Sequence, residues 1–250
     1  MPTTLIVLAH PSRKSFNGAW AEASAAACEA AGHKVLWSDL SAHQFDAVEG
    51  ARHFGQDPSG QFDPLKAHEA AVAEGMLPGD TAAEVEKIKA ADLIIFHFPL
   101  WWFAPPAVLK GWFDRVLVHG DLHRVEDRFD TGLCRGKRAL FCVTTGASAA
   151  ECGPGGKEGD VNMLLWPSAY TLRYLGMDVY VPEVVHSVHG YFAGAEEAAL
   201  QARLGRVLDG QAELVDGLGK RPLLPFNADS DFDENGRLKA GVKSVSGFIT

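Results

Sequence analysis

The chain has 250 residues, of which 47% are apolar and 22% charged, and its formal net charge is −9 at pH 7. This length supports one sizeable core, the composition argues against a disordered chain, and no apolar run is long enough for a transmembrane helix. The acidic balance, without clusters of Lys and Arg, argues against nucleic-acid binding, because phosphate backbones are held mainly by such clusters. The first residues lack the basic segment of a signal peptide, so we expect a cytoplasmic protein without membrane insertion.

Strand and helix signals alternate in the first half, as in strand–helix–strand units around a parallel sheet. The pattern predicts a strand at 5–10, an Ala-rich helix at 17–31 and a second strand at 33–37. Residues 41–79 show weak periodicity and several Gly and Pro, which indicates a long irregular segment. We expect a segment of this length to be functional. A helix at 82–90 then precedes a strand at 91–98, whose apolar run is typical of a strand buried on both faces.

The second half continues the alternation. An amphipathic helix is predicted at 107–115, a fourth strand at 139–143, a helix at 162–175, a fifth strand at 177–181 and a last helix at 195–217. The fold class is therefore α/β, a flavodoxin-like five-stranded parallel sheet with helices on both faces. We expect this flavodoxin-like domain to occupy residues 1–222 and an irregular C-terminal tail to occupy 223–250.

Three loops at strand carboxyl ends carry the residues that point to a ligand, and ligands bind at that edge of such sheets. The third strand leads into Trp101, Trp102 and Phe103, flanked by prolines that stiffen the turn. These rings could stack on a flat ligand, or they could pack against a neighbouring helix or subunit. The loop at 10–18 offers hydroxyls and a helix start for a phosphate, and the fourth strand ends in small polar residues at 144–148.

Five segments, at 10–17, 98–103, 109–113, 144–146 and 165–167, resemble in order and spacing the NAD(P)H:quinone oxidoreductase family of flavodoxin-like flavoproteins. The similarity extends from Thr4 to Pro222. It implies a homodimer that binds FAD, with FMN less favoured. It also implies a ping-pong reaction in which NADH or NADPH reduces the flavin, which then passes two electrons to a quinone.

The resemblance also implies which residues hold the flavin. The phosphates would be held by His10, Ser15, Phe16 and Asn17, and Ala19 would lie beside them. The ring would be lined by Pro99, Leu100, Trp101, Trp102 and Phe103 on one side and by Thr144, Thr145, Gly146 and Ala147 on the other. Asp114 and Arg203 correspond to family residues near the adenosine.

The chain departs from the family where a Tyr and a His assist the reduced flavin, because those positions hold Cys152 and Glu158. An ionised Glu158 would repel an anionic reduced flavin, whereas a protonated Glu158 could donate a hydrogen bond. Lys157 or backbone N–H groups of the Gly-rich loop could supply the positive charge instead, and we favour these. Alternatively, hydride transfer needs little from side chains because the flavin carries the chemistry.

Two aromatic residues that roof the family's substrate pocket correspond to His123 and Val125. A pocket opened by these changes would favour a second hypothesis, an azo- or nitroaromatic reductase that uses the same flavin. The missing Tyr and His motivate a third, a flavin-binding regulatory subunit with weak turnover.

We expect no metal site. The four cysteines, Cys28, Cys134, Cys142 and Cys152, are widely spaced and form no C-x-x-C pair. Residues 231–236 match the start of a calcium loop, but the twelfth position is Val242 instead of the bidentate Glu.

Overall fold

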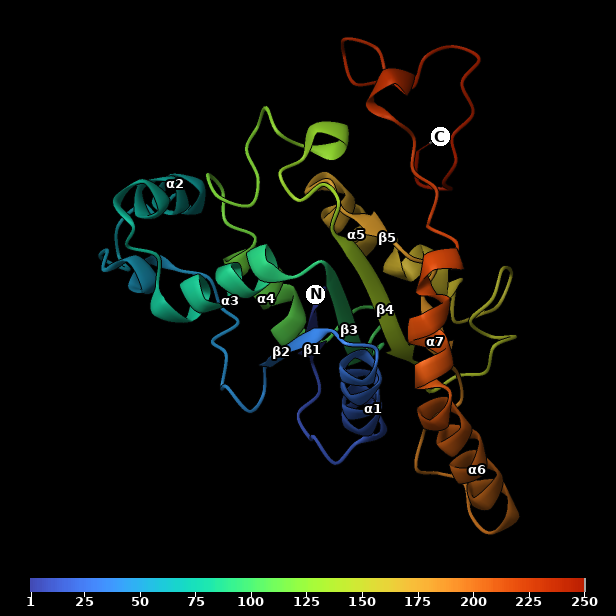
Figure 1. Cartoon of the computed structure of the whole chain (residues 1–250). Coiled ribbons are helices and arrows are strands. Elements are labelled where there is room, and N and C mark those ends of the chain that lie inside the picture. Colours follow the sequence, from blue (N-terminus) through green and yellow to red (C-terminus); the bar gives the residue numbers. More distant parts are fainter. Residues whose placement is uncertain (250) are drawn as a thin grey trace.

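The computed structural model describes residues 1–249 as a sheet with helices on both faces (Figure 1). In chain order the elements are β1 (Thr3–Leu8), α1 (Phe16–Ala30), β2 (Lys34–Asp39), α2 (Pro64–Glu74), α3 (Gly79–Ala90), β3 (Leu93–Pro99), α4 (Ala107–Val116), β4 (Arg138–Thr144), α5 (Val161–Tyr174), β5 (Asp178–Val179), β6 (Glu183–Val185), α6 (Ala195–Asp209) and α7 (Gln211–Gly217), with short 3-10 turns between some of them. No helix in this described range is both long enough and apolar enough to cross a membrane.

The strands are parallel and lie in the order β2-β1-β3-β4-β5, with β6 also paired to β4. This is the order of a flavodoxin-like sheet, as predicted, and its chain reversal lies between β1 and β3. All seven residues of β3 are buried, which fits their apolar run. The carboxyl ends of β1, β3 and β4 consequently meet at one edge of the sheet.

The predicted fifth strand is divided in two, contrary to expectation. β5 pairs with Arg138 and Ala139, and β6 pairs with β4 from Cys142 onward, after two residues of β4 that neither piece pairs with. Pro182 lies between the two pieces, and its lack of an N–H group prevents a continuous ladder. The predicted helix at 195–217 is likewise divided into α6 and α7 at Gly210.

The stretch predicted as irregular contains α2, which the sequence analysis missed. Its start carries a recognisable signal, because the Asp63 carboxylate accepts from the Lys66 N–H and Pro64 follows the cap. Gly75 ends the helix with φ 67°. Weak amphipathicity over only 11 residues explains why the apolar pattern did not reveal this helix.

The core has two halves on opposite faces of the sheet. Helices α3, α4 and α5 cover one face, with Trp112 and Leu165 among their buried residues. Helices α1, α6 and α7 cover the other, with Trp20 packed against β3. On this second face, His97 is fully buried at 5.4 Å from the Trp20 ring, and neither ring nitrogen has a hydrogen-bond partner in the described chain.

Two close backbone approaches fix α4 and α5 relative to their surroundings. A Cβ added at Gly111 of α4 would lie 2.0 Å from the Ala47 carbonyl oxygen, and one added at Gly132 would lie 2.4 Å from the Leu175 carbonyl at the end of α5. The Cys134 N–H also donates to the Leu175 oxygen at 2.8 Å. Only glycine allows backbone segments to approach this closely.

The tail at 223–249 lies at one end of the molecule (Figure 1). The Leu224 N–H donates to the Val179 oxygen at 2.7 Å, and Phe248 stacks on Trp166 of α5 with ring centroids 4.3 Å apart. Asp229 to Asp231 forms a single 3-10 turn. The tail is otherwise irregular, and it is attached to the domain through β5 and α5.

Candidate active site

The loop between β1 and α1 folds against its own helix. Ser15 caps α1 and accepts from the Gly18 N–H at 3.1 Å, while the Ser12 N–H donates to His10 Nδ1 at 3.0 Å. A Cβ at Gly18 would lie 2.1 Å from the Arg13 oxygen, so the tight loop requires glycine there. The free N–H groups of this helix start are suited to an anion such as a phosphate. Phe16 packs on Trp20, whereas the Ala19 side chain is exposed.

A buried hydrogen bond joins this loop to the end of β4. The Thr144 hydroxyl donates to Asn17 Oδ1 at 3.0 Å, and both residues are almost completely buried. Asn17 Nδ2 is also buried and has no hydrogen-bond partner among residues 1–249. An unpaired buried amide is costly, so it is the kind of group that a bound ligand would satisfy.

The loop after β3 forms a tight turn in which two bulky residues are left-handed. Trp101 and Ala104 exchange both backbone hydrogen bonds, at 2.9 and 3.1 Å, around Trp102 with φ 49° and Phe103 with φ 63°. This conformation costs each non-glycine residue on the order of 1 kcal/mol or more. It projects the Trp102 indole into solvent, where 92% of the residue is exposed. Strain that holds large rings in water points to a binding function.

Two adjoining pockets lie where these loops meet. One has a volume of about 230 Å³ and is lined by Leu100, Trp102, Phe103, Thr145, Gly146, Ala147, Cys152, Glu158 and Leu164. The other, of about 480 Å³, is lined by Pro99, Leu100, Trp101, Trp102, Thr144, Gly146 and Val188. The residues predicted to line a ring from two sides are therefore brought together, with Trp102 common to both pockets. His10 is adjacent, with its ring 5.8 Å from that of Trp101.

These features fit a flavin. Aromatic rings beside the pocket, a helix start for phosphates and the unpaired Asn17 amide supply the three kinds of contact that a phosphate-bearing ring cofactor needs.

The three candidate catalytic residues have different locations. Cys152 and Glu158 line the smaller pocket, and Cys152 is buried at 4% exposure. Lys157 lies outside it, contrary to the interpretation we favoured, because its Nζ pairs with Glu151 at 3.2 Å and 74% of its side chain is exposed. Glu151 also accepts from Ser148, which fixes the carboxylate that holds Lys157 away from the pocket.

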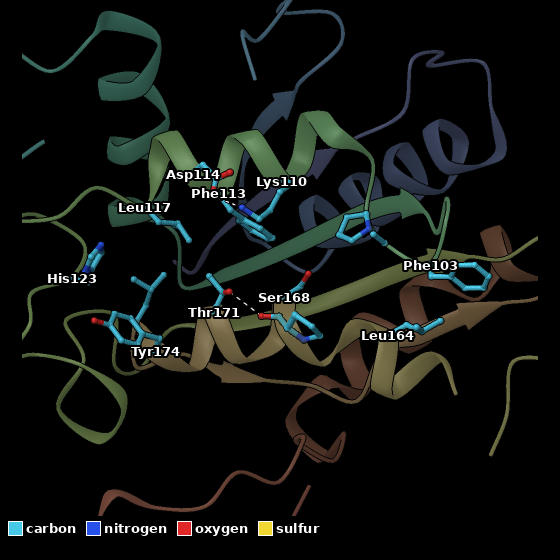
Figure 2. Close-up of a pocket in the computed structure, with 14 residues that line it drawn as sticks. Phe103, Lys110, Phe113, Asp114, Leu117, His123, Leu164, Ser168, Thr171 and Tyr174 are labelled. Carbon is cyan, nitrogen blue, oxygen red and sulfur yellow. Dashed lines mark hydrogen bonds and ion pairs between the residues drawn. The ribbon is translucent and has the colours of Figure 1, made fainter. Parts of the chain in front are cut away.

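A third cavity, of about 500 Å³, extends between α4 and α5 (Figure 2). It shares Phe103 and Leu164 with the smaller pocket, so the two adjoin. His123 lines it together with Tyr174, but Val125 does not and is 53% exposed. The structure therefore brings only one of the two predicted substrate residues to this cavity.

Asp114 and Arg203 do not share a site within one chain. Asp114 lies on α4, lines the large cavity and pairs with Lys110. Arg203 lies on α6, which covers the opposite face of the sheet, and donates to the Ser187 oxygen at 3.2 Å. Arg203 was aligned with the family without a motif near it. One chain alone therefore does not place both Asp114 and Arg203 at an adenosine site.

Two further residues at this site were not among those predicted to hold the flavin. Val188 lines the pocket of about 480 Å³, and His186 Nδ1 lies 2.9 Å from Thr145 Oγ1. Both follow the interrupted fifth strand, whose carboxyl end reaches the same edge of the sheet. The position of that strand was the signal available in the sequence.

Comparisons with known proteins agree with this geometry. Residues 2–209 match a protein-family model described as a flavodoxin-like fold. The chain is 38% identical over 234 residues to NAD(P)H dehydrogenase (quinone) 1 of Rattus norvegicus, covering 92% of this chain and 82% of that protein. It is 37% identical over 188 residues to ribosyldihydronicotinamide dehydrogenase (quinone) of Homo sapiens, covering 72% and 79%.

Solved structures give the same result. A proposed quinone reductase from Klebsiella pneumoniae superposes with a TM-score of 0.82 at 34% identity, covering 96% of this chain and 94% of that one. General stress protein 14 of Treponema denticola, solved in complex with FMN, superposes with a TM-score of 0.58 at 25% identity, covering 87% and 99%.

Proposed function

The chain belongs to the flavodoxin-like family that includes NAD(P)H dehydrogenase (quinone) 1, and from this membership we propose that it is a flavin-dependent NAD(P)H:quinone oxidoreductase. A bound flavin supplies reversible two-electron chemistry, accepting hydride from NADH or NADPH and passing it to a quinone. The observation that carries the proposal is the meeting of the strained Trp102 turn, the Thr145–Ala147 loop and the unpaired Asn17 amide at one edge of the sheet.

The protein's own part is binding and orientation. The loop at 10–18 would hold the phosphates through backbone N–H groups, with Asn17 oriented by its hydrogen bond from the Thr144 hydroxyl. Trp102, Phe103, Thr145 and Gly146, which line one pocket, would contact the ring.

We propose FAD as the flavin, supported by the family resemblance of the segments that surround the site. We further propose a cytoplasmic homodimer, on the same resemblance. Cys152 and Glu158, which replace the family's Tyr and His, line the smaller pocket and would act there, if any side chain does.

The first experiment is an absorption spectrum of the purified protein, followed by identification of the flavin released on denaturation. Stoichiometric FAD supports the proposal, and stoichiometric FMN corrects the cofactor only. A colourless protein that neither flavin reconstitutes would leave the aromatic turn as a packing surface and reject the proposal.

A second candidate function differs only in the molecule that accepts electrons from the flavin. The cavity between α4 and α5 is large and mostly apolar, and His123 is the only one of the two substituted roof positions that faces it within residues 1–249. An azo- or nitroaromatic acceptor fits such a space as well as a quinone does. Steady-state kcat/KM with a quinone, an azo dye and a nitroarene, at equal NADPH, ranks these acceptors.

Trp102→Ala should weaken flavin binding about 5- to 30-fold, because loss of an aromatic contact costs roughly 1–2 kcal/mol. The matched control is Tyr191→Ala, since Tyr191 is 93% exposed but lines none of the three pockets described above. Fluorescence titration of the flavin-free variants gives both dissociation constants. Wild-type affinity in Trp102→Ala would contradict the assignment of this turn as the ring platform.

A further inference from the structure

Two histidines lie together beside the large cavity, and His123 lines it at the end opposite Phe103 (Figure 2). The rings of His119 and His123 are 5.1 Å apart and edge-to-face, and the turn between them is closed by a hydrogen bond from the Gly120 N–H to the His123 oxygen at 2.9 Å. Gly120 has φ 92°, a conformation that favours glycine. The turn therefore holds both rings on one side at a fixed separation.

The pair extends from the cavity toward Glu69 on α2. His123 lines the cavity and meets the Tyr174 ring at 5.6 Å (Figure 2). His119 lies behind it, 7% exposed, with no hydrogen-bond partner for either ring nitrogen in the part of the chain that the structure describes. Its Nδ1 is 3.9 Å from a carboxylate oxygen of Glu69 on α2, and 61% of the Glu69 side chain is exposed.

The ionisable groups around the two rings affect the pKa of His123, the ring that lines the cavity. Burial lowers the pKa of His123, and a charge on His119 lowers it further. The neighbouring ionisable groups are committed to other partners, with His68 to Glu49, Lys110 to Asp114 and Asp121 to Lys89. Tyr174 and Glu69 are the remaining titratable groups that face the two rings.

Reduction of a quinone creates a need for a proton at this place. A quinone that accepts a hydride, which the reduced flavin of the proposed reaction supplies, becomes a hydroquinone monoanion, and one proton on its second oxygen completes the hydroquinone. The positions of the family's Tyr and His hold Cys152, which is buried, and Glu158. His123 supplies an imidazole side chain that lines the large cavity.

We propose that His123 donates this proton to the reduced acceptor and that His119, with Glu69 at the surface, returns a proton to it from solvent. The N–H bond of the imidazolium breaks, an O–H bond forms on the hydroquinone, and His123 becomes neutral. No oxidant or reductant beyond the hydride donor is needed. This role rests on the proposed function and deepens it, because it names the acid of the acceptor half-reaction.

The test separates the acceptor step from the rest of the cycle. Reduced flavoprotein is mixed with a quinone in a stopped-flow instrument between pH 5 and 8. In the wild type the rate constant rises toward acid pH, and in His123→Gln it falls about 100-fold at pH 6 and loses its pH dependence. Oxidation by ferricyanide, which takes electrons without a proton, remains at the wild-type rate in this variant.

A second readout does not depend on turnover. In NMR titrations of the flavin-free protein, His119→Gln should raise the pKa of His123, because removing a neighbouring positive charge favours the imidazolium. His43→Gln is the control, since His43 is exposed in the turn after β2. An unchanged pKa of His123 in His119→Gln would overturn the coupling of the two rings.

The outcomes distinguish this role from the proposed function. A wild-type protein that oxidises NAD(P)H but transfers nothing to any quinone rejects the proposed function, and the role of His123 with it. A working quinone reductase whose His123→Gln variant keeps the wild-type rate and pH profile rejects only the proton donor.

Discussion

Gly111→Ala should lower the free energy of unfolding by about 3 kcal/mol, the upper end of the range for overpacking a core. The added Cβ would lie 2.0 Å from the Ala47 carbonyl oxygen, and that partner is backbone that no side-chain rotation can move aside. Either α4 must shift or the segment at 46–50 must detach. Urea denaturation followed by circular dichroism measures the effect.

Gly205→Ala is the matched control. Gly205 also lies inside a helix, α6, but a Cβ added there would have nothing within 4 Å. The same substitution should therefore stabilise the protein by about 0.5–1 kcal/mol through helix propensity. Equal effects of the two substitutions would show that the close approach of Ala47 does not constrain α4.

Acid should destabilise the protein through His97. Complete burial lowers the pKa of His97 from 6.5 to about 3 in the folded state. The unfolded chain therefore binds the proton first, so that the stabilisation is complete above pH 6.5 and is lost as the pH falls toward 3. The loss attributable to this residue at pH 4 is about 3 kcal/mol, taking 1.36 kcal/mol for each pKa unit.

His97→Leu tests this expectation. Leucine removes the titrating ring and both unpaired nitrogens from an apolar environment, so the variant should lose less stability between pH 7 and pH 4 than the wild type. His43→Gln, at an exposed position, should follow the wild-type curve. Parallel curves for the wild type and His97→Leu would contradict the assignment of acid sensitivity to His97.

The sequence was sufficient to predict the sheet and the loops that meet at its edge. The apolar run of β3 and the turn residues after it are local features, and local features place Trp102 and Thr145 correctly at strand carboxyl ends. The division of the last strand was missed because it depends on the neighbouring strand. Pro182 has no N–H group to donate, and this interrupts the strand only because β4 lies beside it.

Side-chain directions within the site were less predictable. Lys157 was favoured, together with backbone N–H groups of the Gly-rich loop, as a source of positive charge near the flavin. Lys157 pairs instead with Glu151, and that pairing depends on how the loop turns. Likewise His119 meets His123 because a glycine with positive φ closes the turn between them. Both arrangements follow from backbone geometry that composition and spacing do not encode.

The close approaches at Gly111 and Gly132 also bear on how the acceptor range of this protein can change. Each places main chain against main chain beside α4 or α5, so a shift of α4 toward Ala47, or of the end of α5 toward Gly132, would bring backbone into collision. New acceptors must therefore be accommodated by trimming side chains such as Phe113 and Leu117, which is a route open to single substitutions during evolution.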